Sequence, residues 1–218
     1  MEHQDDAFVV ADICRLLLDG HQVQARDVAS RLLPFVPRPK KKPQRKSVNT
    51  TTKRDKGDAK RLNLTERRKL EIWRRDGFRS RKSGARLVYP QTLELLSLLL
   101  PSELPYDNPP HGKYALTHIL MWELWPAIDH VISVRNSTDT AIANNLDNLI
   151  TLSAPENSGK SWFDLEHLGW SLLPSEPLPD WDGLVGWYVQ YLDKDPLWFD
   201  HPTSGRRFKR WHRRLSRR

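Results

Sequence analysis

The chain has 218 residues, of which 38% are hydrophobic and 28% charged, and its formal net charge is +8. This composition supports one medium domain with segments outside its core, and no apolar run is long enough to cross a bilayer. A single cysteine, Cys14, excludes an internal disulfide framework and a multi-cysteine zinc site. The acidic N-terminus lacks the features of a signal peptide, so we expect a soluble, cytoplasmic protein.

The basic charge is concentrated in two segments. Residues 37–61 hold 11 basic and 2 acidic side chains, and residues 205–218 hold 8 Lys/Arg and no acid. Residues 87–204, in contrast, hold 4 basic and 16 acidic side chains. This polarity predicts a polyanion partner bound by the two basic segments; the alternative is that they only keep the chain soluble. The basic runs lack an apolar helical face, which argues against a membrane surface as the partner.

The N-terminal third predicts helices around a linker. Apolar spacing over 7–18 and 23–33 predicts a helical hairpin within residues 1–36, able to pack on the main body or on a partner, including a second copy. Residues 37–61 predict a disordered basic linker. Asn63 and Glu66 form a capping-box pattern. It would open a helix over 64–75, which Gly77 would close.

The rest of the chain predicts a mixture of helices and short strands. The expected elements, in chain order, are a hairpin over 78–88, helices over 91–100 and 114–125, strands over 128–134 and 149–152, a helix over 155–168, and an amphipathic helix over 183–192. The last helix lies in a Trp/Pro-rich extension, 171–204, expected to pack on the core. Residues 205–218 predict a basic tail without an apolar face, in which Trp211 could lie against nucleic acid.

The polar residues of the two predicted strands and the following helix can converge on one phosphate. Asp129 and His130 are adjacent on the first strand, Asn148 precedes the second, and Asn157 and Lys160 open the helix. Neighbouring residues of a regular strand face opposite sides. We therefore expect a bulge to aim the first two side chains at one site.

This arrangement resembles the HNH endonuclease family. The separation of 18 residues from His130 to Asn148, and of nine more to Asn157, is close to the spacing of that family. The resemblance covers about residues 64–170, within a nuclease domain expected over 62–170. It implies an α+β fold, with a ββα-metal core and inserted and flanking helices. A bacterial or phage origin would follow from it.

The resemblance also implies roles for the five polar residues. His130 would be the general base, Asp129 and Asn157 would ligate one Mg²⁺ or Mn²⁺, Asn148 would brace the loop after His130, and Lys160 would contact a phosphate. Imidazole titrates near neutrality, and Mg²⁺ prefers oxygen ligands. Each role has a structural alternative. Asp129 and His130 could be a polar pair at a strand end, Asn148 could form a turn before the second strand, and Lys160 could be a solvated helix residue.

The chain departs from many members of the family at the zinc knuckles. The positions that match the four cysteines are Ser80, Ser83, Ser153 and Glu156, which cannot form a thiolate site. We expect no structural zinc. The apolar insertion between residues 87 and 125, with the Trp-rich segment after residue 162, would replace its contribution to stability.

The sequence therefore predicts a metal-dependent endonuclease that hydrolyses DNA phosphodiester bonds. A catalytically inactive nucleic-acid-binding protein of the same fold is the alternative, and an RNA-binding protein is a third reading. The residues predicted to contact nucleic acid are cations of the nuclease domain and of the basic C-terminal segment: Arg67, Arg68, Arg74, Arg81, Lys82, Arg135, Arg206, Arg207, Arg210, Arg213 and Arg214.

Overall fold

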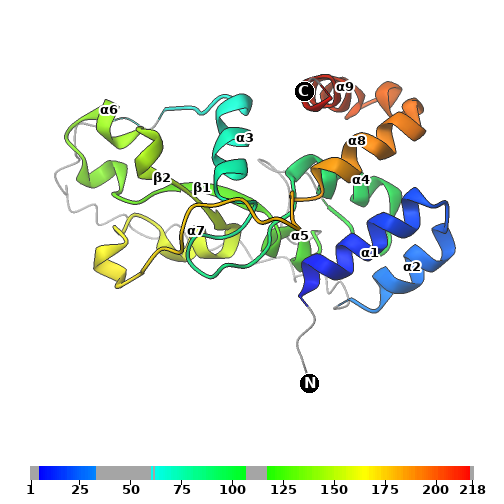
Figure 1. Ribbon diagram of the computed structural model, residues 1–218, viewed down its shortest axis with the longest axis horizontal. Helices are drawn as coiled ribbons and strands as arrows, with labels where there is room; N and C mark the ends of the chain where they lie inside the picture. Colours follow the sequence, from blue (N-terminus) through cyan, green and yellow to red (C-terminus); the bar gives the residue numbers. More distant parts are fainter. Residues whose placement is uncertain (1–4, 33–59, 61, 107–116, 217–218) are drawn as a thin grey trace, which may run out of the picture.

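The computed structural model describes residues 5–32, 60, 62–106 and 117–216. Helices and one small antiparallel sheet make up the fold, which is of the α+β type. In Figure 1 the sheet, α6 and α7 lie on the left, α1, α2, α4, α8 and α9 lie on the right, and α3 stands between the two groups. The elements are α1 (Asp6–Leu18), α2 (Gln22–Ser30), α3 (Glu66–Arg75), α4 (Pro90–Leu99), α5 (Ile119–Glu123), β1 (Pro126–His130), α6 (Thr140–Ala143), β2 (Leu149–Ser153), α7 (Ala154–Lys160), α8 (Val185–Lys194) and α9 (Gly205–Leu215), with 3-10 turns at Val134–Asn136, Leu146–Asn148, Glu166–Leu168 and Pro196–Asp200.

The predicted N-terminal hairpin forms, and it packs on the main body. Asp5 caps α1 by accepting a hydrogen bond from Ala7 N at 3.1 Å. The apolar face of α1 and α2 belongs to the main core, and Trp187 Nε1 of α8 donates to Cys14 O at 2.5 Å. The sequence left open whether this hairpin packs on the main body or on a partner. Its apolar face packs on the main body.

Helix α3 begins two residues later than predicted. Its N-cap is Thr65, whose hydroxyl accepts a hydrogen bond from Arg68 N at 3.3 Å, and not Asn63. Gly77 follows the C-cap residue and has a φ of +66°, a conformation that favours glycine. A Cβ atom at Gly77 would lie 2.6 Å from Glu176 O, so the close passage of the 176–178 segment also requires glycine here.

The main core lies among α1, α2, α3, α4, α5, α8 and α9. The predicted hairpin over 78–88 is reduced to one β-bridge, between Arg79 and Arg86, around a turn. Helix α4 matches its prediction, whereas the helix expected over 114–125 is confined to α5, and residues 107–116 lie outside the described part. The buried leucines of α4 and α5 belong to this core, so the apolar insertion does contribute to it.

The sheet and the helix after it form a compact ββα unit. Strands β1 and β2 pair antiparallel with one-to-one register, from Pro126 opposite Ser153 to His130 opposite Leu149. The expected bulge is therefore absent from this pairing, and β1 ends at His130, earlier than predicted. Helix α7 follows β2 directly and packs on both strands. It ends at Lys160, because Ser161 takes a φ of +54°, so the helix predicted over 155–168 is broken there.

The basic C-terminal segment is a helix and not a tail without an apolar face. Helix α9 buries Phe208 and Trp211 against the main core, with the Trp211 ring edge-on to Tyr89 at a centroid distance of 5.6 Å. Trp211 is 3% exposed, so a nucleic-acid base cannot stack on its face. Phe208 and Trp211 are three residues apart, so they lie on the same side of the helix and form its apolar face.

The helices of the described segments are all too short or too polar to cross a lipid bilayer. The disordered linker was predicted over residues 37–61. Of these residues the structure describes only Lys60, so the prediction lies outside the described residues. The backbone N–H of Lys60 donates to Thr140 Oγ1 of α6 at 3.0 Å.

Candidate active site

The ββα unit carries the five residues of the predicted site. Asp129 and His130 end β1, and Asn148 ends the 3-10 turn that leads into β2. Asn157 and Lys160 lie one helical turn apart on α7, which covers both strands. The site is therefore built from a strand end, a strand beginning and one helix face.

Asn148 ties the loop after His130 to the start of β2. Its side-chain oxygen accepts a hydrogen bond from Ile132 N at 2.8 Å, and its amide nitrogen donates to Ile132 O at 3.0 Å and to Ala143 O at 2.8 Å. Its backbone carbonyl accepts a further bond from Val131 N at 2.9 Å. The side chain thus joins two loops and is not the local turn-former of the alternative reading. These bonds also explain why the chain leaves the sheet at His130.

Asp129 is paired with the buried cation Lys160. Lys160 Nζ lies 3.2 Å from Asp129 Oδ2, and Lys160 is 0% exposed. The two groups are not aligned as a hydrogen bond, so the contact is an ion pair. Burial by itself raises the pKa of Asp129, but the contacts with His130 and the charge of Lys160 hold that pKa below its ordinary value. Lys160 is therefore neither solvated nor open to a phosphate in this arrangement.

His130 faces a groove with one ring nitrogen unused. Its Nδ1 lies 3.9 Å from Asp129 Oδ1, a distance too long for a hydrogen bond. Its Nε2 is buried and has no hydrogen-bond partner among the described residues. The groove has a volume of about 580 Å³ and runs between α3, β1 and α7. Asn157, Trp73 and Trp211 line it together with His130. An imidazole nitrogen can accept a proton from a bound water, but Nε2 is covered in this arrangement, so a neighbouring side chain has to move before water reaches it.

The site contains oxygen atoms of the types that bind a hydrated divalent ion. Asp129 Oδ2 is a buried carboxylate oxygen without a hydrogen bond, and Asn157 offers an amide oxygen on the helix that covers it. Mg²⁺ accepts one or two protein oxygens and keeps several waters. Within the described residues no group of three or more His, Cys, Asp or Glu side chains could hold a metal. Asp129 and Asn157 therefore provide oxygen donors of the right kind, but Asn157 lines the groove beside His130, whereas Asp129 pairs with Lys160 and is not among the residues that line that groove.

The four positions that match zinc knuckles meet in space, although the two halves lie 70 or more positions apart in the sequence. Ser80 Oγ donates to Glu156 Oε2 at 2.5 Å, and Ser153 N donates to the same oxygen at 2.9 Å. Ser83 N donates to Ser80 Oγ at 3.2 Å. Burial raises the pKa of Glu156, but hydrogen bonds from the three serines hold it below its usual range. A carboxylate–hydroxyl cluster thus joins the 80–83 turn to the start of α7, in addition to the apolar segments expected to do so.

We predict that the folded protein holds no stoichiometric zinc, because this cluster presents three hydroxyls and one carboxylate where a structural zinc site has four thiolate or imidazole ligands. Elemental analysis of protein purified without chelator should give well under one zinc per chain. About one zinc per chain, retained through dialysis, would contradict the prediction.

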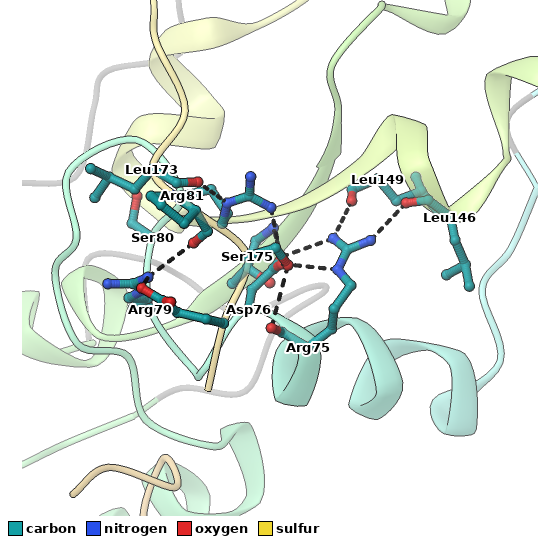
Figure 2. A network of polar contacts seen from close by, with 12 residues as sticks. Arg75, Asp76, Arg79, Ser80, Arg81, Leu146, Leu149, Leu173 and Ser175 are labelled. Atoms are coloured by element: carbon teal, nitrogen blue, oxygen red, sulfur yellow. Dashed lines mark hydrogen bonds and ion pairs between the residues drawn. The ribbon is translucent and has the colours of Figure 1, made fainter. Parts of the chain in front are cut away.

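Asp76, which the sequence reading overlooked, organises the side of the site opposite α7. Figure 2 shows its carboxylate among Arg75, Arg81 and Ser175. The backbone N–H of Thr151 also donates to this carboxylate, at 2.9 Å. Asp76 is 0% exposed. Burial by itself raises the pKa of Asp76. The hydrogen bonds and the charge of Arg75 lower this pKa by more, so that it lies below its ordinary value. The network joins α3, the 79–86 turn, β2 and the 173–175 segment.

Several predicted nucleic-acid contacts are used inside the molecule. Arg81 donates to Leu173 O at 2.5 Å and pairs with Asp76, as Figure 2 shows, so we now assign it a structural role. Arg207 pairs with Glu94, and its side chain is turned toward α4. Lys82 lies over the Trp170 ring, and Arg210 and Arg214 contact Glu66. The predicted contacts that remain largely at the surface are Arg67, Arg68, Arg74, Lys82, Arg135, Arg206, Arg210, Arg213 and Arg214.

Comparison with known proteins gives no family for the chain. No family model matches it, and neither a curated protein nor a solved structure matches it.

Proposed function

We propose that the chain is a metal-dependent endonuclease of the HNH type that hydrolyses DNA phosphodiester bonds. The observation that carries the proposal is the ββα unit, in which Asn148 braces the loop beside His130, a residue that lines the groove and whose buried Nε2 has no hydrogen-bond partner among the described residues. The convergence of Ser80 and Ser83 with Ser153 and Glu156 supports the same alignment to the family, because those positions were matched from sequence alone.

Each residue has a chemical role in the proposal. His130 Nε2 accepts a proton from the water that attacks the phosphorus atom. Asn148 holds the backbone after His130, so that the imidazole keeps its position during the reaction. Asp129 lies beside Nδ1 of the imidazole, and the positive charge of Lys160 keeps the carboxylate ionised. The groove between α3 and β1 receives the strand to be cut.

Asp129 and Asn157 are the residues that would hold a divalent ion. Such an ion supplies positive charge that stabilises the phosphate oxygens as negative charge develops on them. For Asp129 to serve as a ligand, Lys160 has to move away from Oδ2, and the freed ammonium is then able to contact a phosphate. The proposed setting is the cytoplasm of a bacterium, either nucleoid-associated or phage-encoded.

The proposal predicts that the wild-type protein nicks supercoiled plasmid in the presence of Mg²⁺ or Mn²⁺ and that EDTA stops the reaction. Conversion of supercoiled to open-circular DNA on an agarose gel measures it. One ββα site cuts one strand, so open circles should precede linear DNA. An absence of nicking with every divalent metal would contradict the proposal.

A second candidate is a nucleic-acid-binding protein of this fold that has no activity. The Lys160–Asp129 ion pair at 3.2 Å favours it, because the ammonium already neutralises the one carboxylate at the site. This candidate predicts DNA binding without nicking and no effect of divalent metal on affinity. The plasmid assay, together with a binding assay in EDTA and in Mg²⁺, separates the two.

A further inference from the structure

Helix α9 carries a hollow lined by cations. Its apolar face is buried, and the remaining side chains surround a hollow of about 510 Å³ in which the described lining is entirely basic. A concave surface with one sign of charge concentrates the opposite ion. The lining residues are Arg206, Lys209, Arg210, Arg213 and Arg214.

The five cations differ in whether an acid already contacts them. Arg210 and Arg214 both pair with the carboxylate of Glu66 on α3. Arg206, Lys209 and Arg213 have no ion pair with an acid in the part of the chain that the structure describes. They stand at i, i+3 and i+7, so they share one helix face. At 1.5 Å per residue they span about 10 Å, comparable to three nucleotides at 3.4 Å each along one strand of a duplex.

The hollow adjoins the groove that contains His130. Glu66 and Trp211 line that groove, and Glu66 also contacts the two arginines of the hollow. A strand seated on α9 would therefore continue over the α3–α9 contact into the groove. The apolar face of α9 is buried in the core, so the helix cannot insert into a lipid surface as an amphipathic anchor does.

We propose that the hollow on α9 docks the phosphate backbone of duplex DNA and that Glu66 restrains its affinity by holding Arg210 and Arg214. The proposal rests on the proposed function for its ligand, and it names the surface that delivers the strand to the groove. Docking supplies affinity and no sequence preference, since only phosphates are contacted.

The first test measures binding of a fluorescein-labelled 24-bp DNA duplex by anisotropy, in EDTA and over a range of KCl concentrations. The triple variant Arg206→Gln/Lys209→Gln/Arg213→Gln should weaken binding and reduce the slope of log K against log[salt] by about 2–3, at 0.9 for each phosphate that is no longer neutralised. The matched control Arg15→Gln/Arg26→Gln/Arg31→Gln removes the same charge from the N-terminal hairpin, where each arginine has an acidic neighbour. It should change the slope far less.

The second test uses Glu66→Gln, which frees two arginines. Binding should become tighter, and the salt slope should steepen by up to about 2. A merely structural role of Glu66 would weaken binding or leave it unchanged. Equal effects of the two triple variants, or no tightening by Glu66→Gln, would overturn the proposal.

Plasmid nicking by the same variants keeps the two proposals apart. If wild type nicks DNA while the α9 triple variant binds as wild type does, the docking site is wrong and the endonuclease stands. If the α9 variant loses binding while no protein nicks DNA, the endonuclease is wrong and the docking surface stands. Binding to phosphatidylserine vesicles in preference to DNA would overturn the docking proposal.

Discussion

A His130→Ala variant is expected to cleave DNA about 10²–10⁴ times more slowly than the wild type, because the proposed proton acceptor is removed. The buried Nε2 of His130 has no hydrogen-bond partner among the described residues, so removal of the imidazole breaks no hydrogen bond of that nitrogen within the described part of the chain. Single-turnover nicking of plasmid measures the rate, and circular dichroism verifies folding. His21→Ala, an exposed position at the N-cap of α2, is the matched control and should leave cleavage unchanged.

Asp129→Ala distinguishes a metal ligand from a base. Cleavage should also fall, but raising the metal concentration or replacing Mg²⁺ with Mn²⁺ should restore part of the rate, because the defect lies in metal binding. The same change of metal should not rescue His130→Ala. Wild-type cleavage by a folded His130→Ala protein would remove His130 from the mechanism and leave the ββα unit without its proposed base.

Replacement of Asp76 should produce the largest loss of stability. Asp76→Ala leaves Arg75 and Arg81 without their shared carboxylate and Thr151 N without its acceptor. Removal of one partner of a buried ion pair destabilises by about 3–5 kcal/mol. Urea unfolding at pH 7 measures the change. The control is Asp12→Ala, whose exposed ion pair with Arg15 should contribute at most about 1 kcal/mol.

The stability that Asp76 provides should depend on pH with a defined sign. Its folded pKa is depressed, so the carboxylate stabilises the fold fully above its unfolded pKa of about 3.9 and loses that effect as pH falls through the folded value. The difference in free energy of unfolding between wild type and Asp76→Asn should therefore be constant between pH 5 and 7 and shrink below about pH 4. A difference that grows at low pH would contradict this assignment.

The sequence by itself determined the features that depend on local pattern. Helices α1, α4 and α8 follow from apolar periodicity, and the β1–β2 pair from two short apolar runs separated by a polar loop. The order Asp129-His130, Asn148 and Asn157 along the chain located the candidate site. These features were accessible because neighbouring residues decide them: helical and strand periods are local properties of the backbone.

Element ends were less accessible, because distant groups decide several of them. Strand β1 ends at His130, where the Asn148 side chain takes the backbone polar groups of Ile132. The C-terminal segment looked like an unstructured tail because its many arginines mask two aromatic residues. Phe208 and Trp211 make a helix only because a core lies beneath them to bury them.

Only the tertiary structure decided which charges are free. Along the sequence, Arg81, Arg207 and Arg210 are equivalent cations, yet Asp76, Glu94 and Glu66 contact them across the fold. The same holds for Lys160, which is buried and paired with Asp129. The spacing of these two residues in the sequence does not indicate that contact. An ion pair forms between groups brought within about 4 Å by folding, and residues far apart in sequence carry no local signal of that approach. The pattern of the chain therefore predicted the kinds of groups at the site, and folding determined their partners.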